Sequence, residues 1–297
     1  MNDPTERTLA TVRLPNAFSQ WRVLFGQRWV LFFRDKSQVV LQLSLMFIFP
    51  CLVILFAFQG LPQMENLGLA LNPNVVQELE ETIRFTIQTS QVGSLVSGLI
   101  MFQVVLLSLM GSNNSAREVV AERLIFEKEK LAGLRPLSYL AAKASFLFIL
   151  VAAQSLVMAI FVKLVCGFPG DILMQILYLF LANLAITSIC LAVSCWARTP
   201  EQASLVSIYL VGFQLPLSGA ILALPEPLGA LVRPFISAYW SWSGILQTMQ
   251  DTRFYDAVLK ITKTPIASGD MSLWVLVLHV VAGFLAAYAG TVRGRWD

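Results

Sequence analysis

The sequence predicts an all-α membrane protein with six transmembrane helices, and two observations lead to this fold class. Of the 297 residues, 57% are hydrophobic and 13% are charged, whereas soluble domains carry about 25% charged residues. The mean hydropathy is +0.69. A helix needs about 20 mostly apolar residues to cross the hydrocarbon core of a bilayer. Six segments meet that requirement: 39–59, 93–112, 140–164, 172–197, 204–224 and 272–292.

These spans use most of the chain and divide it into two parts. We expect a cytoplasmic N-terminal segment over residues 1–38 and a six-helix transmembrane domain over residues 39–297. The first part holds six basic residues and no apolar stretch of the kind found in a signal peptide. We therefore expect no cleavable signal and no separate soluble domain.

An aromatic pattern precedes the first span. Aromatic side chains recur there at helical spacing, in the set Phe18, Trp21, Phe25, Trp29 and Phe32. This pattern predicts an N-terminal helix that lies in the inner membrane interface. A merely amphipathic segment that leads into the first span is an equally good interpretation.

A seventh apolar stretch, residues 227–250, differs from the six spans. Arg233 and Pro234 interrupt it. Aromatic residues, which favour the membrane–water interface, cluster beside this interruption at Phe235, Tyr239, Trp240 and Trp242. We interpret the stretch as an external helix pair, either re-entrant or lying on the surface, and not as a span.

The basic residues outside the spans predict the orientation, because cytoplasmic segments carry an excess of lysine and arginine. With both termini in the cytoplasm, the inner segments hold 14 basic residues and the outer segments hold 5. We therefore expect a multi-pass protein of the plasma (inner) membrane with both termini cytoplasmic. Lys143 and Lys163 lie near the ends of the third span, where long side chains reach the interface.

Polar side chains inside the spans predict packing contacts. Uncharged amides commonly form hydrogen bonds between membrane helices, and we expect this role for Gln42, Gln103, Gln154, Gln175, Asn183 and Gln214, with His279 as a further polar residue in a span. No acidic residue lies near the centre of a span. A carboxylate proton relay of the kind found in pumps is therefore not indicated.

The charged stretch from Ser115 to Lys143 separates the second and third spans. Ser115 and Glu118 have the spacing of a capping box, and both Arg123–Glu127 and Glu127–Lys130 have the spacing of helix ion pairs. Gly133 suits the position after a helix end and Pro136 suits a stop. We expect a polar cytoplasmic helix over 116–131 that binds a soluble partner. The alternative is a solvated helix without function.

This stretch resembles a known family. The pattern Glu122-Arg123-x-x-Phe126-x-x-Glu129-x-x-x-Gly133, followed by Ser138-Tyr139-x-x-Ala142-Lys143, is similar to the loop between spans two and three in the G (White) subfamily of ATP-binding-cassette (ABC) exporters, which are type-2 permeases. Asn114 through Glu122 resembles the opening of this loop in bacterial relatives. A second similarity is Gln214-x-x-x-Ser218-Gly219 in the fifth span.

The resemblance implies an architecture and partners. It implies a homodimer, or a pair with a closely related permease half, around a cavity lined by spans two and five. A coupling helix transmits the closure of an ABC ATPase subunit, which binds ATP and Mg. The resemblance assigns the coupling role to Glu118, Glu122, Arg123, Phe126, Glu127 and Glu129, the cavity to Met101, Val105, Phe213 and Leu217, and an upper gate to Ala220 and Ile221.

The remaining patterns limit the function. The chain contains no G-x-x-x-x-G-K-[ST] motif, so we expect the ATPase to be a separate polypeptide. A net charge of +3 does not indicate nucleic acid, and a single histidine does not indicate a metal site. We expect no catalytic residue, no metal and no cofactor in this chain.

The expected function is that of the permease subunit of an ATP-driven exporter. The expected cargo is amphipathic or hydrophobic, such as a lipid, a drug-like molecule or a glycoconjugate. The alternative is a membrane scaffold or regulator that has a permease fold but does not transport. A weaker third hypothesis, an intramembrane hydrolase, needs a serine beside His279.

Overall fold

The computed structural model describes residues 15–56 and 75–293, which form helices and no strand. Residues 1–14, residues 57–59 of the first predicted span, and Arg295 lie outside the described residues. Within the described ranges, five helices are long and apolar enough to cross a membrane. The chain is therefore an integral multi-pass membrane protein. These helices are α2 (Lys36–Leu55), α3 (Val75–Ser115), α5 (Pro136–Cys166), α6 (Ile172–Trp196) and α12 (Gly269–Val292).

The predicted fifth span, residues 204–224, is divided in the structure. It consists of α7 (Pro200–Gly212) and the single turn α8 (Gln214–Leu217), and the chain is not helical from residue 218 to 225. Pro216 accounts for the division, because it has no N–H to donate to the carbonyl of Gly212 four residues earlier. Neither piece alone is long enough to cross a bilayer, so this fifth span, and with it the total of six, stays a prediction.

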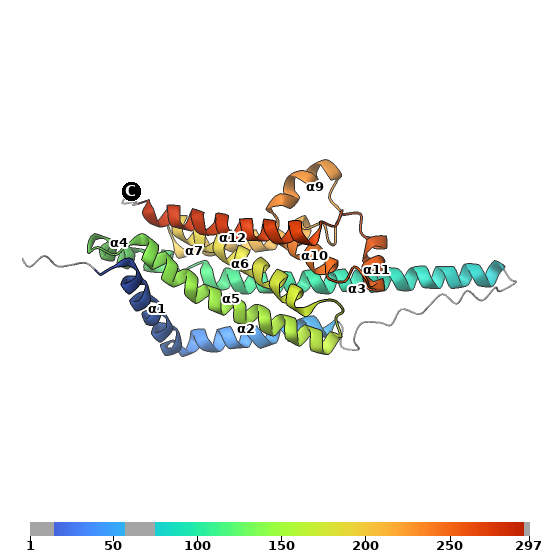
Figure 1. Cartoon of the computed structure of the whole chain (residues 1–297), viewed down its shortest axis with the longest axis horizontal. Coiled ribbons are helices and arrows are strands. Elements are labelled where there is room, and N and C mark those ends of the chain that lie inside the picture. Colours follow the sequence, from blue (N-terminus) through green and yellow to red (C-terminus); the bar gives the residue numbers. More distant parts are fainter. Residues whose placement is uncertain (1–14, 57–74, 294–297) are drawn as a thin grey trace, which may run out of the picture.

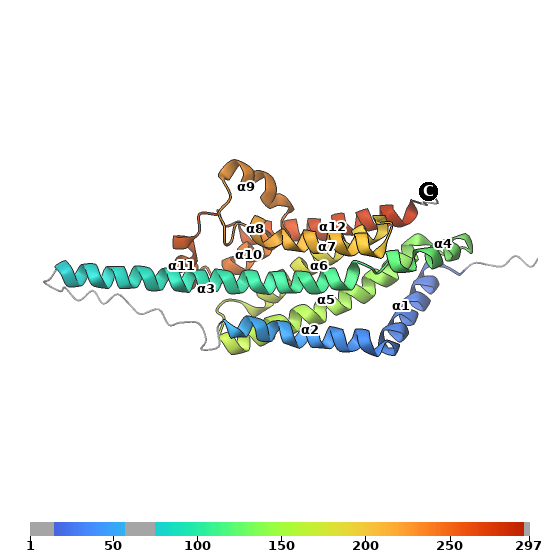
Figure 2. The same ribbon diagram turned by 180° about the vertical axis from the view of Figure 1, so that it is seen from behind.

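The helix α6 lies at the centre of the bundle, packed against α3, α5, α10 and α12 (Figures 1 and 2). Glycines allow two of these close approaches. A Cβ atom on Gly283 of α12 would lie 2.8 Å from the backbone carbon of Ser188, and one on Gly111 of α3 would lie 3.1 Å from the carbonyl oxygen of Asn183. Both neighbours belong to α6, so these glycines set its distance from two other helices.

Figures 1 and 2 show that the bundle has two different ends. The helices α1 (Ala17–Arg34) and α4 (Arg123–Leu131) lie at the same end of the bundle as the last turn of α12. At the opposite end lie α9 (Glu226–Val232) and α11 (Arg253–Ile261), and α3 projects beyond the bundle there. The segments predicted as inner and outer are thus grouped at opposite ends, while their orientation in a membrane stays a prediction.

The outer part of α3 was not predicted as helix, because residues 75–92 are too polar for a span. The structure places α11 against it. A Cβ atom on Gly93 would lie 2.8 Å from the carbonyl carbon of Ala257, and the ammonium of Lys260 lies 5.3 Å from the ring centre of Phe85. Contacts with α11 therefore extend α3 beyond the apolar segment that the sequence identifies.

The aromatic stripe of α1 packs against α5. The ring centres of Trp29 and Phe32 lie 4.9 and 5.4 Å from that of Phe146, and the indole N–H of Trp21 donates to Ser145 at 3.2 Å. The predicted helix is present. Its aromatic side chains serve protein packing, and its position in the membrane interface stays a prediction.

Helices are present where an external helix pair is predicted, but the second of them is buried. Next to α9, the 3-10 helix η2 (Arg233–Phe235) contains the predicted interruption, and α10 (Ser237–Gln247) follows. Every residue from Ser237 to Leu246 is buried, and the indole N–H of Trp242 donates to Ser97 of α3 at 3.0 Å. The surface-lying interpretation is therefore wrong for α10, whereas re-entry into the membrane stays a prediction.

Four buried amides form a network between helices, as predicted for the polar residues in the spans. Gln42 of α2 donates to Asn114 of α3, which donates to Gln154 of α5 at 3.3 Å. Gln154 donates back to Gln42 at 3.1 Å, and it also accepts from Asn183 of α6 at 3.4 Å. The network connects four helices, and Asn114 is a member that the sequence did not single out.

Candidate functional site

The charged segment after α3 consists of short pieces, so the continuous helix predicted over 116–131 is wrong. A turn follows α3, then the 3-10 helix η1 (Val120–Glu122), then α4. The hydroxyl oxygen of Ser194 in α6 accepts the N–H groups of Val119 and Val120 at 3.0 and 3.1 Å. This tertiary contact, together with the low helix propensity of β-branched residues, explains the break.

The predicted capping box is also absent. The Ser115 hydroxyl donates to the carbonyl of Gly111 at 2.7 Å, inside α3. The carboxylate of Glu118 turns toward α1 and α5. The end of α4, in contrast, is as predicted: Leu134 N–H donates to the carbonyl of Glu129 at 3.0 Å, Gly133 has a φ of 102°, and Pro136 begins α5.

Buried ion pairs connect this segment to α1 and α5. Arg28 of α1 contacts both carboxylate oxygens of Glu118 at 2.7 Å. Lys143 of α5 lies 3.1 Å from Glu118 and 2.6 Å from Glu122. Its side chain is only 7% exposed, so the expectation that Lys143 reaches the interface is wrong. Lys163 donates instead to the carbonyl of Gly170 at 2.6 Å.

Two cations of α4 hold the ends of other helices. Arg123 donates to the carbonyls of Cys195 and Ala197 at the C-terminus of α6, the latter at 2.6 Å. Lys130 donates to the carbonyls of Thr291 and Val292 at the end of α12, at 3.3 and 3.4 Å. Cations are favourable at helix C-termini. The segment after α3 therefore contacts α1, α5, α6 and α12.

The predicted ion pairs within the segment are only partly formed. Lys130 lies 3.7 Å from Glu127, as expected. The predicted pair between Arg123 and Glu127 is wrong, because the guanidinium is bound to α6.

The six predicted coupling residues differ in exposure. Phe126 is 3% exposed and stacks on Tyr139, with ring centres 4.2 Å apart, and Glu118 is also buried. Glu122, Arg123 and Glu127 are half-buried, and Glu129 is exposed. Most of the set therefore positions the segment, and its role toward a partner stays a prediction. The sequence analysis did not identify Arg28 and Lys143 as partners of these acids, although a cation on an apolar helix indicates that a partner acid exists.

An apolar surface lies on the outside of α4. Leu124, Ile125 and Leu131 are 75%, 59% and 78% exposed. They lie on a helix with five charged side chains in nine residues, which is unsuited to contact with lipid tails. Exposed apolar side chains next to charged residues are typical of a surface that binds another protein. We call these three residues the α4 apolar patch.

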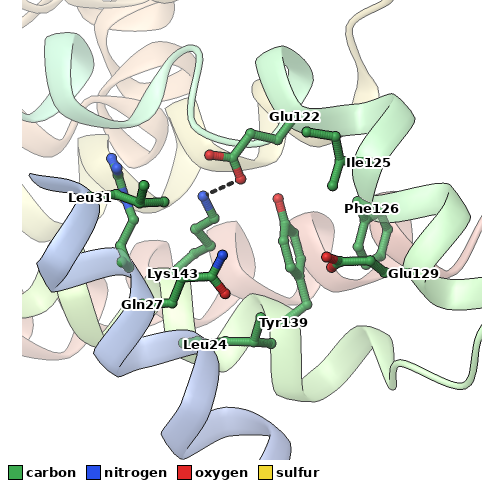
Figure 3. A pocket seen from close by; sticks show the side chains of 11 residues that line it. Leu24, Gln27, Leu31, Glu122, Ile125, Phe126, Glu129, Tyr139 and Lys143 are labelled. Carbon is green, nitrogen blue, oxygen red and sulfur yellow. Dashed lines mark hydrogen bonds and ion pairs between the residues drawn. The ribbon is translucent and has the colours of Figure 1, made fainter.

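A pocket of about 140 Å³ lies beside this patch, between α1, α4 and α5. Figure 3 shows Lys143 and Tyr139 of α5 pointing toward α4, with the Tyr139 hydroxyl between Glu122 and Ile125. Apolar walls come from α1 and α4, and Glu129 lies at the edge. The lining residues are Leu24, Gln27, Arg28, Leu31, Glu122, Ile125, Phe126, Glu129, Tyr139, Ala142 and Lys143.

A second pocket, of about 270 Å³, lies toward the other end of the bundle. Its lining is almost entirely apolar, and Ser94 supplies the one polar side chain among the residues that line it. The lining consists of Phe56, Ser94, Leu95, Gly98, Leu99, Phe102, Leu215 and Ile221. A pocket of this composition suits an apolar ligand.

The four predicted cavity residues fall on different faces. Met101 is fully buried in the core of the chain, so it does not face an open cavity and its assignment is wrong. The next residue, Phe102, lines the apolar pocket instead. Val105 and Leu217 are half-buried, and Phe213 is 56% exposed. The prediction took Met101 instead of its neighbour Phe102 as the cavity-facing residue of α3, because both faces of this helix are apolar and the pattern does not distinguish them.

The predicted upper gate lies in the non-helical segment after α8. Gly219 has a φ of 75°, and its carbonyl accepts the hydroxyl of Thr264 at 2.7 Å. Ala220 accepts from Ser97 at 3.3 Å, and Ile221 lines the apolar pocket. The Gln214 side chain accepts the N–H of Ala238 at 2.9 Å, at the start of α10. The gate role itself stays a prediction.

The hydrolase hypothesis needs a serine beside His279. The ring Nδ1 of His279 lies 2.9 Å from the carbonyl oxygen of Val275 in its own helix. Among the described residues, no hydrogen bond joins this ring to a serine. The structure gives this hypothesis no support.

Comparisons with known proteins agree with a transporter fold. The family described as ABC-2 type transporter matches residues 19–233. The chain is also similar to the ABC transporter ATP-binding/permease protein Rv1747 of Mycobacterium tuberculosis (strain ATCC 25618 / H37Rv), with 26% identity over 205 residues. This match covers 63% of the chain but only 22% of the mycobacterial protein. ABC-2 permease domains are membrane transport components and are not themselves catalytic. The chain belongs to the ABC-2 type transporter family.

Proposed function

We propose that this chain is the permease subunit of an ATP-driven exporter and that an ABC ATPase docks on α4. The observation that carries this proposal is the position of the segment after α3. Its contacts reach α1, α5 and the C-terminal ends of α6 and α12 through ion pairs and hydrogen bonds. A displacement of α4 by a partner is thereby passed to four helices at once.

The partner is an ATPase subunit that binds ATP and Mg, and two permease halves surround the cargo path. The mycobacterial relative is an ATP-binding/permease protein, which supports this partnership. The α4 apolar patch is the contact surface. An exposed face of α7 and the residue after it supports the dimer. Its large side chains, each more than half exposed, are Leu205, Ile208, Tyr209 and Phe213.

The cargo is amphipathic or hydrophobic. The apolar pocket of about 270 Å³ supports this choice, because none of the residues that line it is charged. Its lining includes Ile221 of the proposed upper gate. An apolar part of the cargo, such as an acyl chain, therefore passes this pocket before release.

Co-purification tests the proposal. A tagged chain is expected to recover an ABC ATPase from its native membranes, and Leu124→Asp or Leu131→Asp is expected to abolish that recovery. Leu79→Asp is the matched control, because Leu79 is 60% exposed on α3 at the opposite end of the bundle. If both α4 variants recover as much ATPase as the control, the docking proposal is wrong. A complex that hydrolyses ATP without export supports the scaffold function instead.

A further inference from the structure

The pocket between α1, α4 and α5 contains a carboxylate that forms no ion pair within the described residues. Arg28 and Lys143 are its two cations, and both are already bound to Glu118 or Glu122. Glu129 lies at the edge of the pocket, and no ion pair engages its carboxylate within the part of the chain that the structure describes. Glu129 is therefore a carboxylate of the lining that no cation in this part of the structure pairs with.

A hydrogen-bonding group in the same pocket lacks a partner. Tyr139 is 4% exposed, and its hydroxyl has no hydrogen-bond partner among the described residues. Figure 3 shows this hydroxyl pointing into the space between Glu122 and Ile125. Buried polar groups are normally hydrogen-bonded, so an orphaned hydroxyl beside an unpaired carboxylate indicates a polar ligand that carries positive charge.

We propose that this pocket receives an arginine side chain of the ATPase subunit. The inference rests on the proposed function and goes beyond it by naming the chemistry of the contact. A guanidinium presents five N–H donors in a plane. The pocket offers acceptors on several sides, in the carboxylates of Glu122 and Glu129 and the oxygen of Tyr139. A volume of about 140 Å³ accommodates a guanidinium and part of its stem.

The walls of the pocket suit the rest of such a side chain. Leu24, Leu31 and Ile125 provide apolar surface for its methylene groups, as arginine stems commonly use. A phospholipid headgroup fits less well, because its phosphate needs a free cation. Both cations of the pocket are occupied by carboxylates at distances of 2.6 to 3.1 Å.

Insertion of the arginine also changes the ion pairs around the pocket. The guanidinium competes with the ammonium of Lys143 for the carboxylate of Glu122. In the structure this ammonium and this carboxylate lie 2.6 Å apart. Lys143 keeps its second partner, Glu118, at 3.1 Å. Docking therefore weakens the ion pair between η1 and α5 without leaving a buried charge unpaired.

The affinity of the purified permease for its ATPase tests this contact. We expect Glu129→Gln to weaken binding at least tenfold and Tyr139→Phe to weaken it several-fold. Glu129 is exposed and Tyr139→Phe removes only the hydroxyl, so both variants are expected to fold. Glu201→Gln is the matched control, since Glu201 is an exposed acid of α7 that does not line the pocket, and it is expected to bind within twofold of wild type.

A photo-crosslinker at Ile125 identifies the occupant. The expected product joins Ile125 to an ATPase peptide in which an arginine is within reach, and replacing that arginine by glutamine reproduces the loss seen for Glu129→Gln. Crosslinks to lipid alone, or unchanged affinity for both pocket variants, would overturn the inference. If wild-type permease binds no ATPase at all, the proposed function itself fails.

Discussion

The carboxylate of Glu118 and the ammonium of Lys143 lie 3.1 Å apart, and the two side chains are 6% and 7% exposed. This ion pair joins the segment after α3 to the start of α5, and Arg28 extends it to α1. A buried charge is tolerated only when a partner compensates it. The pair therefore fixes where the segment lies, and the following predictions begin from it.

Replacing Glu118 by Gln is expected to destabilise the chain. The substitution leaves the buried Arg28 without its carboxylate, and breaking a buried pair costs about 3–5 kcal/mol. The measurement is the free energy of unfolding of the protein in detergent. Glu80→Gln is the control, because Glu80 and Arg84 form an exposed pair that is worth about 0–1 kcal/mol. Equal effects of the two substitutions would contradict the role of Glu118.

Gly283→Ala is expected to separate α12 from α6. The new Cβ atom would meet the backbone of Ser188 at 2.8 Å, and backbone atoms cannot move aside as a flexible side chain does. We expect a loss of about 1–3 kcal/mol, typical of overpacking, visible as a lower melting temperature. Gly26→Ala in α1 meets no atom within 4 Å and is expected to keep the wild-type value or raise it.

Phe102 and Met101 are expected to respond differently to alanine. Phe102 lines the apolar pocket, whereas Met101 is fully buried. Phe102→Ala should weaken the binding of a fluorescent acyl-chain probe and leave folding close to wild type. Met101→Ala should cost about 2–5 kcal/mol of stability, as other buried truncations do, and leave the binding of the probe by the folded fraction unchanged. The reverse pattern would place the cargo path on another face of α3.

Cysteine labelling tests the orientation. In a background in which the exposed Cys51 is replaced by serine, a membrane-impermeant maleimide added from outside should label Asp256→Cys on α11. It should not label Lys128→Cys on α4 until the membrane is opened. Both positions are exposed in the structure, so a difference reports the side of the membrane. Labelling of position 128 from outside would invert the topology.

The sequence predicts much of the fold because hydropathy marks a membrane helix directly. It locates α2, α5, α6 and α12 to within a few residues. It fails where tertiary contacts decide the backbone. Ser194 binds the N–H groups that would continue a helix after Ser115, and α11 contacts α3 at Phe85 and Gly93, around the start of its apolar segment.

The site is predicted in part for the same reason. The sequence predicts the end of α4 at Gly133 correctly, because that end depends on local backbone preference. It does not predict the partners of the charged residues, since Arg28 and Lys143 are distant in sequence from Glu118. Along α3, where apolar residues occur on all sides, the periodicity does not separate the buried Met101 from the pocket-lining Phe102.

The most direct test of the account is ATP hydrolysis by the chain and its ATPase, reconstituted together in lipid vesicles. We expect turnover to rise when an acyl-chain cargo is added, and this rise to be lost in Leu131→Asp while the permease remains folded. Transfer of the cargo across the membrane should require ATP. Two results would contradict the account. One is a wild-type complex whose ATP hydrolysis does not change when apolar cargo is added, and the other is a Leu131→Asp variant whose ATP hydrolysis rises with cargo as much as that of wild type.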